Sequence, residues 1–118
     1  MGLTSVILEV TNPTNPSKKI RGEFLVDSGS FFTVLPKRMV ETLGLKPDYE
    51  QEFSLADGTT IKRPIGSAFI NFKGRQSASP VILGKATDSA LMGVLSLEAL
   101  GFILDPFKRE LHPIKLRL

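Results

Sequence analysis

A single carboxylate followed by a glycine lies between two apolar runs near the start of the chain. Asp27-Ser28-Gly29 separates Phe24-Leu25-Val26 from Phe31-Phe32-Thr33-Val34-Leu35, and apolar runs rich in β-branched and aromatic residues are typical of buried strands. A carboxylate at the end of such a strand either caps its own turn or acts as a chemical group held in a rigid frame. Asp-Ser-Gly is also ordinary turn chemistry, so the tripeptide alone leaves both interpretations open.

Other side chains that commonly do chemistry are scarce. The chain has no cysteine and one histidine, His112. Disulfides and thiolate sites are therefore excluded, and a zinc site or a Ser-His-Asp triad would depend on His112 alone. We interpret His112 as a surface or strand-end residue and expect neither a metal nor a cofactor.

A carboxylate pair offers the remaining route to hydrolysis. Cleavage of an unactivated amide requires that water lose a proton while the carbonyl oxygen gains one, which two coupled carboxylates can do together. Like charges close together resist simultaneous ionisation, so the pair holds one proton. A chain with one such Asp can complete the pair across the two-fold axis of a homodimer. Asp27 would then make dimerisation a chemical requirement.

Composition limits the classes of partner. The 118 residues suit a single domain, residues 1–118, and the hydrophobic fraction of 42% is that of a folded protein without a membrane-spanning run. The net charge of +3 comes from scattered basic residues, so we expect no nucleic acid and no membrane as partner, and a basic nucleic-acid binder is the weakest alternative. The lack of cysteine and of a secretory signal predicts a cytoplasmic location.

Strands are expected to position the carboxylate. Alternation and turn residues predict a first strand, a proline-rich loop, two strands flanking Asp27, and a short helix ended by Gly44. These elements are Thr4–Val10, Asn12–Ser17, Lys19–Val26, Phe31–Leu35 and Pro36–Leu43.

The second half should also be mostly β. Asp57-Gly58 between extended segments predicts a hairpin, and Ser96 is a good cap for a second short helix that ends at Gly101. The strands expected here are Glu52–Leu55, Thr60–Ile65, Ala68–Phe72, Ser79–Leu83, Phe102–Leu104 and a last strand, Lys115–Leu118.

The two helix endings resemble each other. Glu41-Thr42-Leu43-Gly44-Leu45 and Glu98-Ala99-Leu100-Gly101-Phe102 each follow an apolar strand and a turn. Either short helices often end in Leu-Gly, or the fold has two related halves. If the halves are related, only the first has an Asp directly after its strand, because Leu83-Gly84-Lys85 has none.

Three motifs together resemble the retroviral-type (retropepsin-like) aspartic proteases, and the small single-domain prokaryotic members most closely. They are Leu25-Val26-Asp27-Ser28-Gly29-Ser30 followed by Thr33-Val34-Leu35-Pro36, the Leu55-Ala56-Asp57-Gly58-Thr59 hairpin, and Leu91-Met92-Gly93 running into Leu97-Glu98-Ala99-Leu100-Gly101. The resemblance covers about Thr4 to Pro113. It implies a mostly β fold, a closed acid-protease β-barrel with a flap hairpin and one or two short helices, assembled as a homodimer.

The resemblance also implies roles for individual residues. Asp27 would be catalytic, the Ser28 hydroxyl would form a hydrogen bond across the dimer axis, and Gly29 would let its backbone approach the carboxylates. Residues 53–65 would form the flap, with Ala56, Asp57, Gly58 and Thr59 near its tip, and Leu91, Met92 and Gly93 would support the turn and line a pocket. Two positions depart from the viral pattern, namely Ser30, where Ala is usual, and Asp57, in a tip that is usually glycine-rich.

The function implied is that of an aspartic endopeptidase acting on a peptide or protein substrate bound like an added strand. The alternative is a non-catalytic domain of the same fold that serves as a dimerisation or peptide-binding module.

Overall fold

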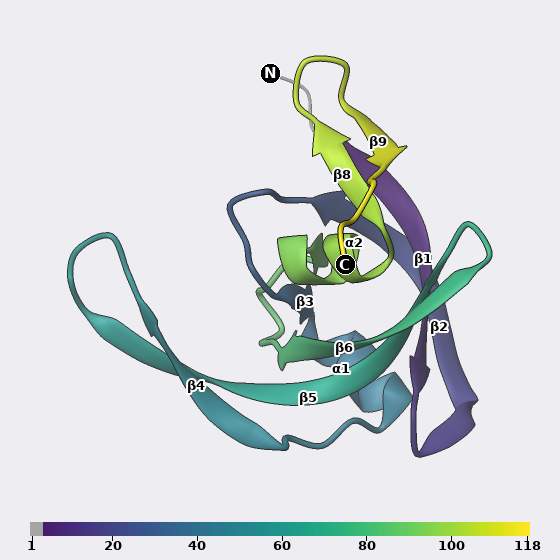
Figure 1. Cartoon of the computed structure of the whole chain (residues 1–118). Coiled ribbons are helices and arrows are strands. Elements are labelled where there is room, and N and C mark those ends of the chain that lie inside the picture. Colours follow the sequence, from purple (N-terminus) through teal and green to yellow (C-terminus); the bar gives the residue numbers. More distant parts are fainter. Residues whose placement is uncertain (1–3) are drawn as a thin grey trace.

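The structure, a computed structural model that describes residues 4–118, consists mainly of strands (Figure 1). In chain order its elements are β1 (Ser5–Asn12), β2 (Asn15–Val26), β3 (Thr33–Leu35), α1 (Lys37–Leu43), β4 (Tyr49–Ser54), β5 (Thr60–Phe72), β6 (Arg75–Leu83), β7 (Leu91–Met92), α2 (Val94–Ala99), β8 (Phe102–Asp105) and β9 (Glu110–Pro113).

Most strands belong to one sheet in the order β1-β2-β7-β3-β6-β5-β4, and β1 pairs in addition with β5. Neighbours along the chain pair antiparallel, as in β1–β2, β4–β5 and β5–β6. Two crossing pairs are parallel: β2 with β7, where Val26 is opposite Met92, and β3 with β6, where Thr33 is opposite Val81. The β2–β7 pair brings the segment after β2 against the segment around β7.

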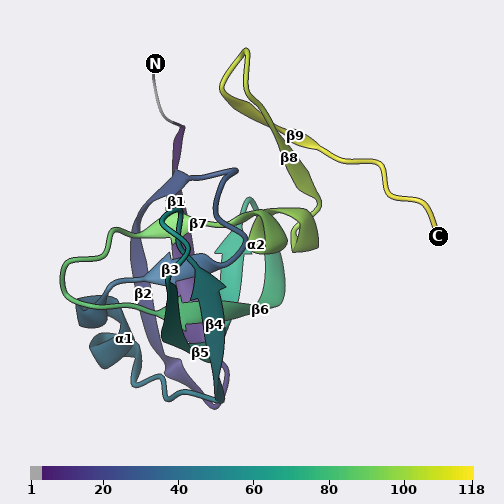
Figure 2. The same ribbon diagram turned by 90° about the vertical axis from the view of Figure 1, so that its left-hand side faces the viewer.

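The core lies among these strands and the two helices. All residues of β3 are buried, as predicted for a strand covered on both faces. Helix α1 contributes Met39 and Leu43 to the core, and α2 contributes Leu97. In Figure 2, β3 lies between α1 and α2. The ends of the helices are marked by left-handed glycines, Gly44 with φ of 67° and Gly101 with φ of 85°, as the sequence predicted.

The loop predicted for Asn12–Ser17 is wrong, because β1 and β2 continue into this segment. Asn12 favours a tight turn: its Oδ1 accepts hydrogen bonds from the Thr14 N–H and hydroxyl, each at 2.9 Å, and its Nδ2 donates to the Leu43 carbonyl at 2.8 Å. Pro16 is tolerated because it lies in an exposed irregularity of the register, where a missing N–H removes no regular ladder bond.

Two other boundaries differ for packing reasons. The segments Thr60–Ile65 and Ala68–Phe72 form one strand, β5, in which Gly66 allows close approach: a Cβ there would lie 3.1 Å from a Leu83 methyl and 3.2 Å from the Lys46 carbonyl oxygen. The strand expected at Phe31–Leu35 begins only at Thr33, and Phe31 is 58% exposed.

The second helix also begins earlier than predicted. Ser96 does not cap it, because the N-cap is Gly93 and Ser96 is 1% exposed inside α2. Its hydroxyl contacts two other buried hydroxyl groups instead, those of Thr33 and Ser79. Cap propensity was therefore outweighed by a tertiary contact.

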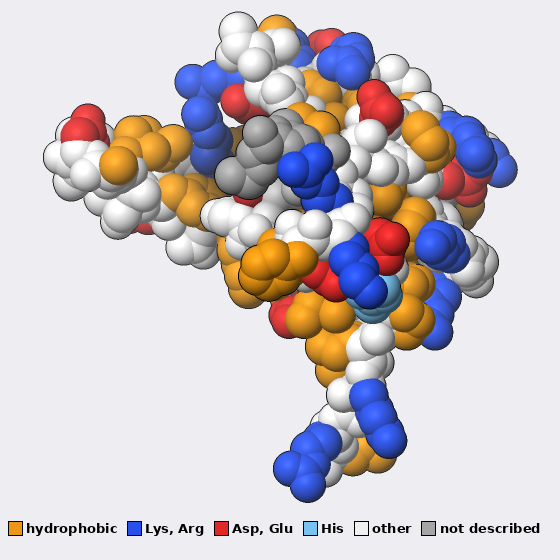
Figure 3. Space-filling model, turned by 90° about the horizontal axis from the view of Figure 1, so that it is seen from above, with side chains coloured by type: hydrophobic (Ala, Val, Ile, Leu, Met, Phe, Trp, Pro, Cys, Tyr) orange, Lys and Arg blue, Asp and Glu red, His pale blue; other side chains and the backbone are white. Residues whose placement is uncertain are grey.

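The last predicted strand, Lys115–Leu118, is absent from the structure. The final pair is instead the β8–β9 hairpin, with Asp105 opposite Glu110, and the segment after Pro113 runs away from the body of the molecule (Figure 2). No strand of residues 4–118 pairs with residues 115–118, so their backbone groups lack the neighbour that a strand requires. Seen from above, both this segment and the β4–β5 hairpin project from the body (Figure 3). Within residues 4–118 neither helix has the length or apolar character to span a membrane.

Candidate active site

Asp27 starts the turn that follows β2. Its N–H donates to the Met92 carbonyl at 3.1 Å, and its own carbonyl accepts from the Ser30 N–H at 3.1 Å. Its Oδ1 accepts a hydrogen bond from the Gly29 N–H at 2.9 Å. The carboxylate therefore does cap its own turn, and the turn is itself fixed to the strand behind it.

One side of this turn is open. Asp27 is half-buried, while Ser28 and Gly29 are exposed. Within residues 4–118, the second carboxylate oxygen, Oδ2, accepts no hydrogen bond. A Cβ at Gly29 would lie 3.2 Å from Oδ1, so a side chain there would crowd the carboxylate. The turn thus combines a fixed backbone with a carboxylate oxygen that is free to bind another group.

Leu91, Met92 and Gly93 lie directly behind the turn. Met92 is fully buried, and Leu91 is half-buried beside Leu25 in the parallel β2–β7 pair. A Cβ at Gly93 would lie only 2.4 Å from the carbonyl carbon of Phe32. Only glycine therefore fits at position 93, and the structure brings all three residues together with Asp27, Ser28 and Gly29.

Three buried hydroxyl groups near this site were not identified from the sequence. Thr33, Ser79 and Ser96 contact one another in series, with oxygen separations of 2.6 Å and 2.7 Å. The signal that could have found them is their position: Thr33 and Ser96 stand within apolar runs and Ser79 directly precedes one, and a buried hydroxyl needs a hydrogen-bond partner.

A series of aromatic rings links the turn to the β4–β5 hairpin. Phe31 and Phe32 pack edge to face with centroids 5.3 Å apart, and Phe32 packs in the same way on Phe53 of β4 at 5.8 Å. Phe53 pairs with Ile61 close to the tip of this hairpin, so the hairpin contacts the segment that follows the turn.

The hairpin tip, Ala56, Asp57, Gly58 and Thr59, is exposed and extends beyond the body of the molecule (Figure 1). Asp57 Oδ1 accepts from the Thr59 hydroxyl at 2.6 Å and from the Thr59 N–H at 3.0 Å. These donors, the hydroxyl first, hold the pKa of Asp57 below its ordinary value of 3.8. Within residues 4–118 the tip's hydrogen bonds are within the tip or with Leu55, and none joins it to Asp27.

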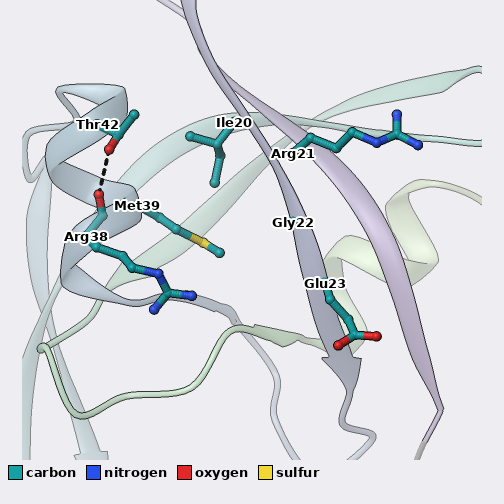
Figure 4. Close-up of a pocket in the computed structure, with 7 residues that line it drawn as sticks. All are labelled: Ile20, Arg21, Gly22, Glu23, Arg38, Met39 and Thr42. Carbon is teal, nitrogen blue, oxygen red and sulfur yellow. Dashed lines mark hydrogen bonds between the residues drawn. The ribbon is translucent and has the colours of Figure 1, made fainter.

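Two other features of residues 4–118 are weaker candidates for a functional site than the Asp27 turn. A hollow of about 460 Å³ lies between β2 and α1; Figure 4 shows Arg38 reaching toward β2 while Arg21 extends away on the other side, so their guanidinium groups do not converge. His112 lies 3.5 Å from both Asp105 and Glu110 on the β8–β9 hairpin. Within residues 4–118 no group of three or more His, Asp or Glu side chains is arranged to hold a metal ion.

Comparisons with known proteins agree with this geometry. A family model described as aspartyl protease matches residues 15–94. No curated protein matches the chain significantly. Among solved structures, the EIAV protease in complex with the inhibitor HBY-793 superposes with a TM-score of 0.60 at 18% identity, over 99% of this chain and 94% of that one. At this identity the likeness shows the fold.

The family match covers more than half of the chain and includes Asp27 as well as Leu91, Met92 and Gly93. With the structural match to a retroviral protease, it confirms the resemblance to retropepsin-like aspartic proteases. The chain belongs to the aspartyl protease family.

Proposed function

We propose that the chain is an aspartic endopeptidase that works as a homodimer, in which Asp27 of each copy forms the catalytic pair. The observation that supports this most directly is the turn itself: Asp27 is held through its N–H and Oδ1, while Oδ2 is open and Ser28 and Gly29 are exposed beside it. A two-fold axis passing this open side would bring the two carboxylates together.

The pair would hydrolyse a peptide bond with one shared proton. The ionised Asp27 removes a proton from water as the water oxygen attacks the carbonyl carbon, and the protonated Asp27 of the partner subunit gives its proton to the carbonyl oxygen. In the resulting diol the newly protonated Asp27 gives its proton to the amide nitrogen, the ionised Asp27 of the partner subunit takes a proton from a diol hydroxyl, and the C–N bond breaks. An acid and an amine leave, and the pair again holds one proton. We expect greatest activity at acid to mildly acid pH, where one carboxyl of the pair is protonated.

Other residues have supporting roles in this proposal. The exposed Ser28 hydroxyl would form a hydrogen bond across the axis, and the Gly29 N–H orients Oδ1. The β4–β5 hairpin would act as the flap over an extended substrate. Of the apolar residues near the turn, Leu25 and Leu95 are half-buried and are the candidates to contact an apolar side chain beside the scissile bond.

Three broader expectations stay predictions. The pairing of β1 with β5, in addition to the main strand order, supports a closed barrel. A single domain over residues 1–118 and a cytoplasmic location follow from length and from the absence of cysteine.

The test compares three proteins on a mixed peptide library, read by mass spectrometry across pH. Asp27→Asn replaces both carboxyl groups of the pair with amides, so it should abolish cleavage. Light scattering should still show the dimer. Asp88→Asn is the matched control, because Asp88 also accepts a backbone N–H in a turn, that of Lys85 at 2.7 Å, and it should cleave like the unaltered chain.

Two results would contradict the proposal. Cleavage that survives Asp27→Asn would refute the assignment of the carboxylate. A strict monomer that is insensitive to a broad aspartic-protease inhibitor would favour the non-catalytic peptide-binding module.

A further inference from the structure

The three buried hydroxyl groups behind the turn belong to elements that are distant in sequence. Thr33 lies in β3, Ser79 in β6 and Ser96 in α2, and their exposed fractions are 0%, 3% and 1%. The Ser96 oxygen lies between the other two, 2.6 Å from Thr33 Oγ1 and 2.7 Å from Ser79 Oγ. Buried polar groups at such distances are hydrogen-bonded, and neighbours strengthen one another.

The partners at the two ends fix the direction of these hydrogen bonds. The Gly93 N–H donates to Thr33 Oγ1 at 3.1 Å, and the Ser79 hydroxyl donates to the Pro80 carbonyl at 3.2 Å. Each hydroxyl has one proton, so Ser79 must accept from Ser96, and Ser96 must accept from Thr33. The series therefore runs in one direction, from the Gly93 N–H to the Pro80 carbonyl, and it satisfies every hydroxyl proton.

Gly93 connects this series to the turn. The residue before it, Met92, accepts the Asp27 N–H at 3.1 Å, and the residue after it, Val94, donates to the Ser30 carbonyl at 2.9 Å. Gly93 itself touches the Phe32 backbone so closely that a Cβ would not fit. A shift of the Gly93 peptide would therefore move both backbone hydrogen bonds that hold the turn containing Asp27.

We propose that Thr33, Ser96 and Ser79 form a directed hydroxyl chain that positions the Asp27 turn through the Gly93 N–H. These are positioning residues, because none of them contacts the carboxylate. The catalytic part of this inference rests on the proposed protease function, whereas the effect on Gly93 does not. A hydroxyl chain that served stability alone would change unfolding without changing the rate per folded molecule.

The key variant is Thr33→Val, which keeps the shape of the side chain and removes its hydroxyl, and Thr33→Ser is the rescue that keeps the hydroxyl. Ser96→Ala removes the middle hydroxyl group of the hydroxyl chain. Ser77→Ala is the matched control, because Ser77 lies on the same strand as Ser79 and its hydroxyl donates to the Ala78 carbonyl at 3.3 Å, outside the chain.

The first readout is amide hydrogen exchange at Gly93, measured by NMR and compared with amides of β1 and β2. Loss of one buried hydrogen bond should speed Gly93 exchange about 10-fold in Thr33→Val and Ser96→Ala beyond any change in the reference amides. The second readout is the rate on a cleaved peptide per folded molecule. A displaced turn should lower kcat about 10- to 100-fold, with a smaller effect on KM. Thr33→Ser and Ser77→Ala should match the unaltered chain in both measurements.

The outcomes separate the two proposals. Unchanged Gly93 exchange in both Thr33→Val and Ser96→Ala would overturn the hydroxyl chain, whereas faster exchange with an unchanged kcat would overturn its role in positioning the Asp27 turn. If Thr33→Val fails to fold, Ser79→Ala, which removes the last hydroxyl group of the hydroxyl chain, provides the same comparison with Ser77→Ala. If no preparation cleaves peptides, the protease proposal fails by itself, and the exchange data still decide whether the hydroxyl chain holds the Gly93 N–H.

Discussion

The two halves of the molecule repeat one arrangement of strands and a helix, but they differ in the residue that follows the strand before the turn. In the first half β2 leads through a turn to β3 and α1, and in the second half β6 leads through a turn to β7 and α2. The halves interlock through two parallel pairs, β2 with β7 and β3 with β6. Both helices are followed by a left-handed glycine, Gly44 or Gly101, whose N–H donates to the carbonyl of Glu41 or Glu98. The similar helix endings in the sequence therefore correspond to similar structural units.

Equivalent hydrogen bonds identify the matching residues at the two turns. The Asp27 N–H donates to the Met92 carbonyl, and the Gly84 N–H donates to the Leu35 carbonyl at 2.8 Å. Gly84 thus occupies the place of Asp27 in the second half. A Cβ at Gly84 would lie 2.7 Å from the Leu35 oxygen, so this turn has no room for a carboxylate. Because each chain provides only one such Asp, a carboxylate pair requires a second copy.

Gly93 should be the glycine most sensitive to substitution, because a Cβ added there would meet its neighbours at a shorter distance than at any other glycine of residues 4–118. In Gly93→Ala the added methyl group would meet the Phe32 carbonyl carbon at 2.4 Å, and we expect a loss of about 3 kcal/mol or more in the free energy of unfolding. Urea unfolding measures this loss. Gly29→Ala is the control, since its nearest contact is the end of the Asp27 side chain at 3.2 Å, and it should cost about 1 kcal/mol or less. Equal losses in the two variants would contradict the proposed role of the close contact.

The turn residues were predictable from the sequence because their signals are local. A carboxylate and glycine between apolar runs marked Asp27 and Gly29, and Asp-Gly marked the hairpin tip. Left-handed helix ends are also local, which is why Gly44 and Gly101 were correctly assigned.

The hydroxyl chain was not predictable in the same way. Its members meet only because β3 pairs with β6 in a particular register, with Thr33 opposite Val81, and because α2 begins at Val94 and so turns Ser96 inward. Local preference suggested instead that Ser96 was a cap. Contacts between distant segments decide such positions, and a single sequence does not reveal them.

Gly84→Ala tests whether the second turn is closed. Its methyl group would meet the Leu35 oxygen at 2.7 Å and the Asp88 carboxylate at 2.8 Å, and we expect a loss of about 2 kcal/mol in the free energy of unfolding. Adding Asp88→Ala removes the second contact but not the first. The double variant should therefore lose less than the sum of the two single losses, and strict additivity would show that Asp88 does not crowd this site.

Asp88→Ala alone should have a smaller effect. Asp88 Oδ2 accepts the Lys85 N–H at 2.7 Å, and the Asp88 N–H donates to the Lys85 carbonyl at 3.1 Å. Loss of the side-chain hydrogen bond should cost about 1 kcal/mol in thermal or urea unfolding. Asp88→Asn keeps an acceptor oxygen and should cost less. If the two variants unfold alike, the carboxylate does not act as a hydrogen-bond acceptor for the turn.

Asp57 at the hairpin tip is another turn carboxylate, and one of its oxygens accepts two local donors. Thr59 lowers the pKa of Asp57, mainly through its hydroxyl and then through its N–H. The stabilisation of the tip is therefore complete above the ordinary value of 3.8 and is lost as the pH falls through the lower pKa of the folded state. The tip should keep its turn at the mildly acid pH expected for catalysis.

Thr59→Val removes the hydroxyl and should raise the Asp57 pKa toward 3.8 in an NMR titration, whereas Thr60→Val, at the neighbouring exposed position, should leave it unchanged. An unaltered titration in Thr59→Val would mean that the hydroxyl does not hold the carboxylate.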